Sequence, residues 1–380
     1  MSAPPLPPLR ILHCLSSLPG EDRAPRLATL IAGLGSDAAH SLVGDAAAVA
    51  AIRAHLAPGC KVIPPASFPS LAGKPTPGRL VTLAEAMQPY DLVCTYNWGA
   101  IDAAMAHGVF AKSLTLPPLI HHEDAFDAIE AERLRTTRNL YRRAALRHAH
   151  ALVVPSLLNA RIAQQAWQQP ANKVVRIAPG IDTAAFAATP DPHAIRVIKR
   201  PGERWVGTVA SLDPASQLPL LVEAMCALPE EWHLVIVGEG PERDAIRAEA
   251  AARELSHRVH LAGAMAEPAR VMGLFDIYAL AAPGEPHSLA VAQAMAAGLP
   301  VAAPDIGDIR AMVAEPNRPF IAVPGKAVAL GQMLADLAED GALRAAIGAA
   351  NRARASTEYA ADRMMAHYRA LYWQAAGRAA

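Results

Sequence analysis

The sequence predicts an α/β protein with two doubly wound parallel sheets, one in each half of the chain. Three observations support this fold class. At 380 residues the chain is longer than one core usually supports, which favours two domains. Short apolar runs alternate with helix-period segments through both halves, as in β-α-β units. A stretch rich in Pro and Gly, 189–203, interrupts the alternation near the middle and is typical of an interdomain linker.

Two series of apolar runs are expected to form the two sheets. The first series comprises 10–15, 41–43, 61–63, 91–95, 118–121, 151–155 and 174–177. The second comprises 205–209, 233–237, 258–261, 276–281, 300–303 and 319–323. We therefore expect an N-terminal domain over 1–188, the linker over 189–203 and a C-terminal domain over 204–358.

The last segment, 359–380, is predicted to be a helix with one apolar face. Met364, Tyr368 and Tyr372 recur there at a spacing of four residues. This helix either covers its own domain or crosses back to pack on the N-terminal one, and the sequence leaves both alternatives open.

The composition is that of a globular protein and argues against nucleic acid as a partner. Basic and acidic side chains balance to a net charge of zero, whereas a nucleic-acid binder needs a positive excess. The longest apolar run, 289–304, is interrupted by Gln293, Gly298 and Pro300, so it reads as helix, turn and strand. No signal peptide is evident at the N-terminus, and we expect a cytoplasmic protein.

The four cysteines indicate neither a disulfide framework nor a metal site. They are scattered without paired short spacings, at Cys14, Cys60, Cys94 and Cys226. We expect them to be reduced, buried core residues.

The segment 284–300 contains the strongest group of polar residues. It follows an apolar strand and opens a helix, which is where a doubly wound sheet presents free N–H groups to ligands. Glu285 stands at the strand exit, and Gln293 lies about two helical turns further along. On this fragment alone the structural explanation is favoured, in which Glu285 caps the helix and Gln293 is solvated.

Further motifs, which follow one another in a fixed order along the chain, favour a functional explanation instead. They are 153–156 (Val-Val-Pro-Ser), 177–182 (Ile-Ala-Pro-Gly-Ile-Asp), 206–209 (Val-Gly-Thr-Val), 212–214 (Leu-Asp-Pro), 235–241 (Val-Ile-Val-Gly-Glu-Gly-Pro), 260–263 (His-Leu-Ala-Gly) and 305–308 (Asp-Ile-Gly-Asp). With them the sequence resembles the retaining glycosyltransferases of family 4. It looks most like a bacterial subgroup through 95–99 (Thr-Tyr-Asn-Trp-Gly) and 121–124 (His-His-Glu-Asp). The resemblance implies the GT-B fold, with two facing Rossmann-like domains, a cleft between them and the donor in the C-terminal one.

The resemblance also implies roles for individual residues of the donor site. Glu285 matches the carboxylate near the donor sugar, and Gln293 stands where a second carboxylate usually binds the ribose. The family's diphosphate-neutralising Arg and Lys correspond to Ser211 and Ser216. Losing two hydrogen bonds to charged groups costs on the order of 3–6 kcal/mol of leaving-group stabilisation. Arg204, Arg243 or Arg310 are candidates to bind the donor diphosphate in place of the missing Arg and Lys.

Other residues are assigned by the same resemblance. Those expected to contact the donor are Gly20, the remaining glycine of a loop that is usually Gly-rich, and Gly238, Gly240, His287, Ser288 and Leu289. His121 and His122 end a strand, and one of them is a candidate to face the reacting hydroxyl. The alternative, to which we give equal weight, is that each histidine only makes a structural hydrogen bond. No Cys or His follows at ligand spacing, so no metal site is expected.

A basic helix is predicted between 128 and 148. Its arginines are Arg133, Arg135, Arg138, Arg142, Arg143 and Arg147. A solvated helix face is the favoured interpretation. The alternative is peripheral contact with the anionic inner face of the membrane, where lipid-linked acceptors reside.

These observations lead to one function and one rival. The first is a retaining, metal-independent and cofactor-free glycosyltransferase that moves a sugar from a nucleotide-diphosphate donor to a bacterial glycan or glycolipid acceptor. The rival is a catalytically weakened or inactive descendant that serves as a binding or scaffold protein, since Ser211, Ser216 and Gln293 replace charged residues. A Rossmann dehydrogenase is disfavoured because no Gly-x-Gly-x-x-Gly follows an early strand.

Overall fold

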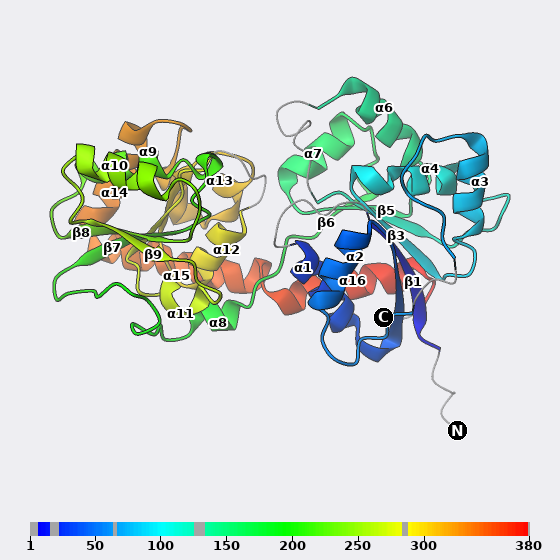
Figure 1. The fold of residues 1–380 in the computed structure, drawn as a ribbon, viewed down its shortest axis with the longest axis horizontal. Helices are drawn as coiled ribbons and strands as arrows, with labels where there is room; N and C mark the ends of the chain where they lie inside the picture. The colour runs from blue at the N-terminus through cyan, green and yellow to red at the C-terminus, as the bar shows by residue number, and fades with distance from the viewer. Residues whose placement is uncertain (1–6, 16–22, 64–66, 125–133, 283–287, 379–380) are drawn as a thin grey trace. The chain divides into compact units, whose positions relative to one another are not determined.

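The computed structural model describes residues 7–15, 23–63, 67–124, 134–282 and 288–378. Its contacts divide the chain into two compact units (Figure 1). Unit 1 comprises Met1–Ala178 and Met364–Ala380, and unit 2 comprises Pro179–Arg363. The segment 189–203 therefore belongs to unit 2.

Six parallel strands form the sheet of unit 1 in the order β2-β1-β3-β4-β5-β6. Their bounds are β1 (Leu9–Leu15), β2 (Ala38–Gly44), β3 (Leu92–Tyr96), β4 (Leu119–His122), β5 (Ala151–Val154) and β6 (Val174–Arg176). The strand expected over 61–63 is wrong, because only Val62 forms an isolated bridge, to His40.

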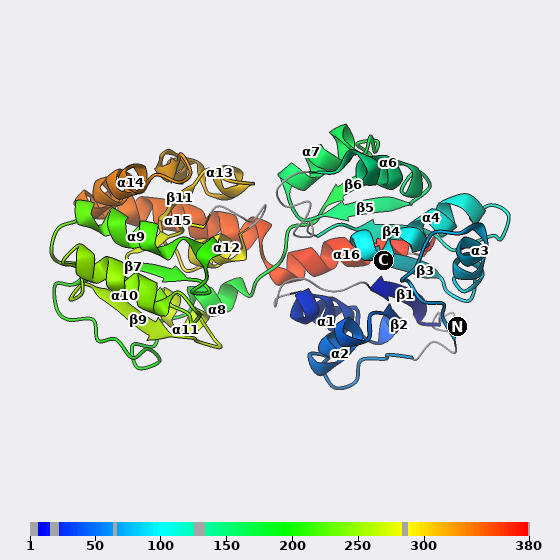
Figure 2. The same ribbon diagram turned by 45° about the horizontal axis from the view of Figure 1, so that its top comes forward.

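Helices cover both faces of this sheet (Figure 2). On one face lie α1 (Arg23–Leu34), α2 (Ala46–Ala54) and α16 (Ala361–Ala375). On the other lie α3 (Pro77–Glu85), α4 (Ile101–Phe110), α6 (Thr136–Ala145) and α7 (Leu157–Gln165). Ile11 of β1 packs into the first core and Leu12 into the second. A strand buried on both faces needs apolar residues at successive positions, which explains the continuous apolar runs.

The sheet of unit 2 has the order β12-β11-β10-β7-β8-β9, again all parallel. Its strands are β7 (Arg204–Val209), β8 (Trp232–Val237), β9 (Val259–Gly263), β10 (Ile277–Ala279), β11 (Val301–Pro304) and β12 (Ile321–Ala322). The last strand is shorter than the expected 319–323, because Pro319 belongs to the preceding 3-10 helix, Glu315–Phe320.

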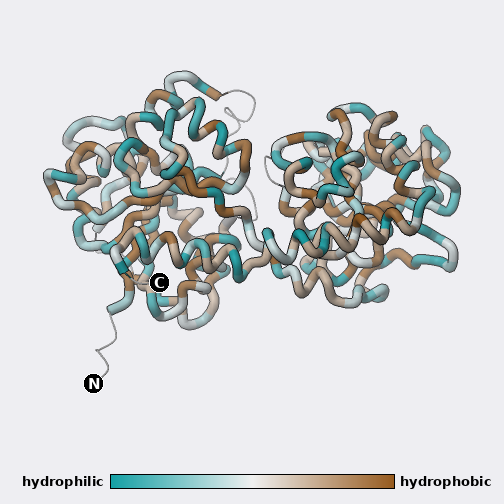
Figure 3. Tube along the Cα trace, turned by 180° about the vertical axis from the view of Figure 1, so that it is seen from behind, coloured by the Kyte–Doolittle hydropathy of each residue, from teal (hydrophilic) through white to brown (hydrophobic). Residues whose placement is uncertain are grey.

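The helices of unit 2 pack on its own sheet. They are α8 (Thr183–Ala187), α9 (Leu218–Ala224), α10 (Arg243–Ala252), α11 (Ala269–Met272), α12 (Leu289–Ala296), α13 (Ile309–Met312), α14 (Ala327–Glu339) and α15 (Gly341–Glu358). Helices α9, α10 and α14 pack on the strands in one apolar cluster, while α12 contacts α15 and α8. Figure 3 shows the apolar residues of both units in brown along the Cα trace.

The cysteines differ from the expectation of four core residues. All four are free, but Cys226 is exposed and Cys60 is half-buried, whereas Cys14 and Cys94 are buried. None of the helices in the described ranges combines the length and the apolar character needed to cross a membrane.

Candidate functional site

The strand orders define one ligand-binding edge in each unit. In unit 1 the chain runs from β1 to β2 and then returns to the other side of β1 for β3. In unit 2 it runs from β7 through β8 to β9 and returns to the other side of β7 for β10. Open parallel sheets bind ligands outside the carboxyl ends of their strands at such switch points. The residues that follow β1, β3, β7 and β10 are therefore the candidates.

At the end of β4, His121 belongs to a buried ion-pair network. Its Nδ1 lies 2.8 Å from Thr95 Oγ1, and its Nε2 lies 3.0 Å from Glu123 Oε2. Arg142 donates to both oxygens of Glu123, at 2.9 and 3.3 Å. His121, Glu123 and Arg142 are all fully buried. Both ring nitrogens of His121 thus have partners inside unit 1.

Glu123 remains ionised in this network. Burial alone would raise the pKa of its carboxyl, but the hydrogen bond from His121 and the charge of Arg142 outweigh burial and hold the pKa below its usual value. The Arg142 guanidinium lies 5.0 Å from the Trp98 ring centroid and 4.8 Å from that of Trp167. A buried charge held by a carboxylate and two aromatic faces is a structural element.

The next residue, His122, has a different environment. Its Nε2 lies 3.0 Å from the Tyr372 hydroxyl of α16, and its ring stacks on Tyr96 at 4.6 Å between centroids. Burial lowers the pKa of His122 to about 3, with a further contribution from His121. His122 is therefore neutral at physiological pH and carries one ring proton.

Two more buried histidines, His13 of β1 and His40 of β2, extend this set of contacts across the sheet. His13 Nδ1 lies 2.8 Å from the Tyr96 hydroxyl, and His13 Nε2 lies 2.9 Å from His40 Nδ1. Burial lowers the pKa of His13, with His40 and His122 adding to the effect, and burial lowers that of His40 to about 4. The sequence analysis missed His13 and Tyr96, although polar residues in neighbouring apolar strands are a visible signal.

His122 and Tyr96 also line a cavity at the carboxyl edge of this sheet. Its lining residues are Arg26, Leu27, Leu30, Tyr96, His122, Asp124, Met364 and Tyr368. They come from α1, from the ends of β3 and β4, and from α16. The cavity therefore combines a cation, a carboxylate, a neutral imidazole and phenol groups next to the switch point of unit 1.

In unit 2, Gly238 and Gly240 bring two loops into close contact. A Cβ at Gly238 would lie 1.8 Å from the Ala210 carbonyl oxygen, and one at Gly240 would lie 2.5 Å from that of Leu212. The Leu212 N–H donates to the Glu239 carbonyl at 3.0 Å. Only glycine allows the loop after β8 to lie this close to the loop after β7.

The two serines that stand in for cations differ in their environment. Ser211 is exposed, directly after β7. Ser216 is engaged by Asp213, whose Oδ1 accepts from the Ser216 N–H at 3.0 Å and from its hydroxyl at 3.2 Å. A carboxylate thus occupies part of the region where the resemblance leads one to expect a lysine.

The cations considered as replacements have partners of their own. Arg243 pairs with Glu239 at 2.8 Å, and Arg310 pairs with Asp305 at 2.6 Å. Arg204 begins β7 and therefore lies at the amino end of the sheet, 3.1 Å from Asp276. A ligand phosphate would compete with these carboxylates for Arg243 and Arg310.

Helix α12 opens at the carboxyl edge of the sheet of unit 2. Ser288 is its N-cap, with Oγ accepting from the Val291 N–H at 3.4 Å, and Leu289 is its first residue. The first N–H groups of a helix attract anions. Gln293 is half-buried and lies little more than one helical turn along α12. Glu285, His287 and Gly20 lie outside the described residues.

The basic helix of unit 1 is not a continuous solvated face. Arg142 is buried, and Arg138 lies over the Trp98 ring at 4.6 Å from its centroid. Arg135, Arg143 and Arg147 are exposed. Arg133 lies outside the described residues. Among the described arginines of this segment, these three exposed ones remain for the membrane-facing alternative.

Comparisons with known proteins agree with this architecture. Residues 194–354, within unit 2, match the family model described as glycosyl transferases group 1. No curated protein sequence matched the chain.

Several solved structures match over nearly the full length of the chain. Anabaena Alr3699/HepE in complex with UDP is 20% identical, with a TM-score of 0.75 and coverage of 95% of this chain and 98% of that one. A glycosyltransferase from Rickettsia africae is 16% identical, with a TM-score of 0.73 and coverage of 97% and 98%. Sucrose-phosphate synthase from Thermosynechococcus elongatus is 19% identical, with a TM-score of 0.70 and coverage of 96% and 98%.

The chain has the GT-B fold. The expectation from the sequence is confirmed for the fold class, since both sheets are six-stranded, parallel and covered by helices. Identities of this size show fold alone.

Proposed function

We propose that this chain is a glycosyltransferase that uses a nucleotide-sugar donor. The observation that carries the proposal is the match of residues 194–354 to the group 1 glycosyl transferase model, within unit 2. The similar HepE structure binds UDP and UDP-glucose, which makes uridine nucleotides the first donors to test. The glycine-dependent loop contact and the α12 N-terminus provide backbone groups that suit a diphosphate.

Within this function, Glu285 would position the donor sugar and Gln293 the ribose. Of the two histidines, we favour His122 as the group near the acceptor hydroxyl. His122 lines the cavity, whereas both ring nitrogens of His121 have partners in the ion-pair network. His121 then acts as a positioning residue, because its two ring nitrogens link Glu123 to Thr95 of β3.

The finer features are transfer with retention of the anomeric configuration, a bacterial glycan or glycolipid acceptor, and independence from metal ions. The anomeric configuration can be checked by NMR of the first product formed. Metal independence predicts that turnover survives excess EDTA, and loss of turnover in EDTA would contradict it.

The direct test is calorimetric titration of the full chain with UDP-glucose, followed by GDP- and ADP-linked sugars. We expect saturable binding of one nucleotide class, accompanied by slow release of the nucleoside diphosphate. Absence of binding for all three classes would overturn the proposal.

A charge-restoring variant sharpens the test. Ser211→Arg returns a cation at an exposed position after β7 and should tighten diphosphate binding roughly tenfold or more. Ser356→Arg, in α15 of the same unit, adds the same charge at another exposed serine and should have no effect. Ser216→Lys is the weaker choice, because the new ammonium would pair with Asp213. Equal binding by both arginine variants would show that Ser211 does not face the donor.

A second candidate is nucleotide-sugar binding without catalysis. It is favoured by the environment of Ser216. The Ser216 hydroxyl donates to the Asp213 carboxylate, at the position where the resemblance leads one to expect a lysine. Under this alternative, UDP-glucose binds to wild type and to Ser211→Arg, yet neither protein releases UDP at a rate above the buffer control.

A further inference from the structure

Ile198 of unit 2 is an apolar side chain held in an exposed position. It is 85% exposed, the largest fraction among the large apolar side chains of the described residues. Single exposed apolar residues are common on protein surfaces. What distinguishes Ile198 is the way its neighbours hold it there.

The segment 195–200 alternates strictly between inward and outward side chains. Ile195 is buried in unit 2, and the Lys199 ammonium bonds Asp276 at 2.6 Å and the Leu274 carbonyl at 2.8 Å. These two residues anchor the segment. The positions between and after them, Arg196, Ile198 and Arg200, are exposed. These three exposed residues, here called the row, place one apolar side chain between two cations in the sequence.

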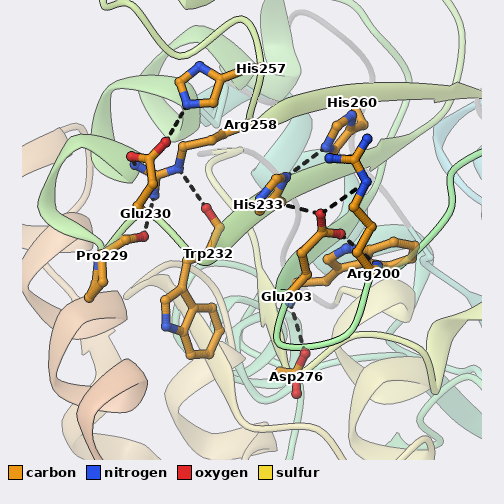
Figure 4. Close-up of polar contacts among 11 residues, drawn as sticks. Arg200, Glu203, Pro229, Glu230, Trp232, His233, His257, Arg258, His260 and Asp276 are labelled. Atoms are coloured by element: carbon orange, nitrogen blue, oxygen red, sulfur yellow. Dashed lines mark hydrogen bonds and ion pairs between the residues drawn. The ribbon is translucent and has the colours of Figure 1, made fainter.

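The two flanking cations are available to a partner. Arg196 makes no ion pair with any side chain of the described residues. The Arg200 side chain is 80% exposed, and its guanidinium reaches only 3.9 Å from Glu203 (Figure 4). Such an exposed contact is weak and easily exchanged for another anion.

A groove with a basic rim lies beside this row. Arg196 and Val197 line one side, and Arg247 of α10 and His260 of β9 line it further along. The remaining lining residues are Ile246, Ala250, Ser256, Val259 and Leu261, so the described lining contains no carboxylate. Figure 4 shows His260 held in place by His233, with His233 Nδ1 2.9 Å from His260 Nε2. The groove therefore carries the guanidinium groups of Arg196 and Arg247, and Arg247 lies 3.6 Å from Asp244.

Val328 provides an internal comparison in the same unit. It is 82% exposed, almost as much as Ile198. Yet the groove beside it is lined by Glu223 and Glu249 together with Lys326. Exposure alone does not separate the two sites. They differ because carboxylates line the groove beside Val328, where both pair with Arg253, whereas none lines the groove beside Ile198.

We propose that the row Arg196, Ile198 and Arg200, with the adjoining basic groove, docks unit 2 on an anionic lipid bilayer. Ile198 enters the interface between headgroups and acyl chains, and the flanking arginines bind lipid phosphates from the groove rim. An acidic protein is the less suitable partner, because a stable protein interface buries about 800 Å² on each side, far more than one isoleucine and a narrow groove offer. This docking does not depend on the proposed enzymatic activity.

The test is flotation of the full chain with vesicles of phosphatidylcholine, with or without phosphatidylglycerol. We expect binding only to vesicles that contain phosphatidylglycerol, and weaker binding as salt increases. Arg196→Ser should weaken binding roughly fivefold, which is the effect of one basic side chain near the surface. Ile198→Ser should also weaken it, while Val328→Ser should bind as wild type does.

Two further variants and one competitor make the outcome decisive. Arg143→Ser with Arg147→Ser removes two exposed cations of unit 1, one in α6 and one just after it, and should leave vesicle binding unchanged. Loss of binding in that variant, or normal binding by Ile198→Ser and Arg196→Ser, would overturn the proposal. Binding of poly-glutamate through Arg196 without any binding of vesicles would identify an acidic protein surface instead. All substituted side chains are exposed, and thermal unfolding should confirm unchanged folding.

Discussion

The two units share one architecture, a six-stranded parallel sheet covered by helices, but they differ in strand order and bury different chemistry. Unit 1 encloses ionisable side chains, with the Glu123 and Arg142 pair on one face of the sheet and His13, His40 and His122 on the other. Unit 2 also buries charged groups, Arg258 and Asp308, but its other buried polar groups include the neutral amides of Asn317 and Asn351, and none of its described histidines is buried. The same fold can therefore be stabilised by protonation-dependent or by protonation-independent contacts. The four predictions below test that difference.

The largest expected effect is a loss of stability of unit 1 in acid. His13, His40 and His122 have pKa values lowered from 6.5 by burial. Their stabilisation is complete above pH 6.5 and is lost as the pH falls toward the folded-state values, because the unfolded chain then binds more protons. Between pH 7 and pH 5 the loss is roughly 2 kcal/mol for each histidine, or about 6 kcal/mol for the three together.

Hydrogen exchange of the full chain, corrected for the intrinsic effect of pH, measures this loss peptide by peptide. Protection in unit 1 should fall between pH 7 and pH 5 more than protection in unit 2. His233 and His260 of unit 2 also have lowered pKa values from burial, but they are only partly buried and a Glu203 charge opposes the shift of each. Equal losses in both units would contradict the comparison.

The next effect comes from breaking the buried ion pair of unit 1. Glu123→Ala leaves the Arg142 charge buried without its carboxylate and should destabilise the protein by about 3–5 kcal/mol in urea unfolding. The double variant Glu123→Leu with Arg142→Met removes both charges and should recover most of that loss. A double variant no more stable than Glu123→Ala would show that the pair contributes through packing instead.

A smaller effect is expected from the amide cluster of unit 2. Asn351 donates to the Leu299 carbonyl at 2.9 Å and to Asn317 Oδ1 at 2.7 Å, and it accepts from the Ala314 N–H at 3.0 Å. Asn351→Ala should cost about 1–3 kcal/mol, since these buried groups lose a partner. The cost should be equal at pH 7 and pH 6, and a difference between the two would link unit 2 to protonation as well.

The smallest effect concerns the cysteines. Burial raises the pKa of the Cys94 thiol to about 12 and also raises that of Cys14, so both should stay unreactive in the folded protein. Cys226 is exposed and should react first with iodoacetamide, without a measurable change in urea midpoint. Peptide mass spectrometry identifies the labelled residue, and early labelling of Cys94 would mean that the core of unit 1 opens readily.

The strands were the most predictable part of this molecule. A parallel strand buried on both faces must be continuously apolar, so runs such as 205–209 and 233–237 are visible in one sequence. The run 61–63 has the same appearance but forms only a bridge, because whether a short apolar run joins a sheet depends on its neighbours in space. Pro319 similarly shortened the last strand by continuing a 3-10 helix.

The candidate site could be predicted only to the level of the sheet edge. The switch points follow from the strand order, and the cavity that His122 lines lies next to that of unit 1. Its partners could not be inferred, because His122 and Tyr372 are 250 positions apart and His13 and Tyr96 are 83 apart. The engagement of Ser216 by Asp213 depends on a local turn that motif matching does not report. The assigned roles of Glu285, His287 and Gly20 stay predictions.

Helix α16 has a consequence for how the protein is made. Met364, Tyr368 and Tyr372 belong to the core of unit 1, yet all of unit 2 is encoded before them. At about 5–20 residues per second, a ribosome needs roughly 10–40 s to add the intervening 179–363. During that time the nascent unit 1 has an open apolar face and a His122 without its tyrosine, while unit 2 emerges complete. Synthesis of unit 1 thus starts before that of unit 2 and ends after it. A nascent chain stalled before residue 364 should therefore hold unit 1 in a state that chaperones recognise.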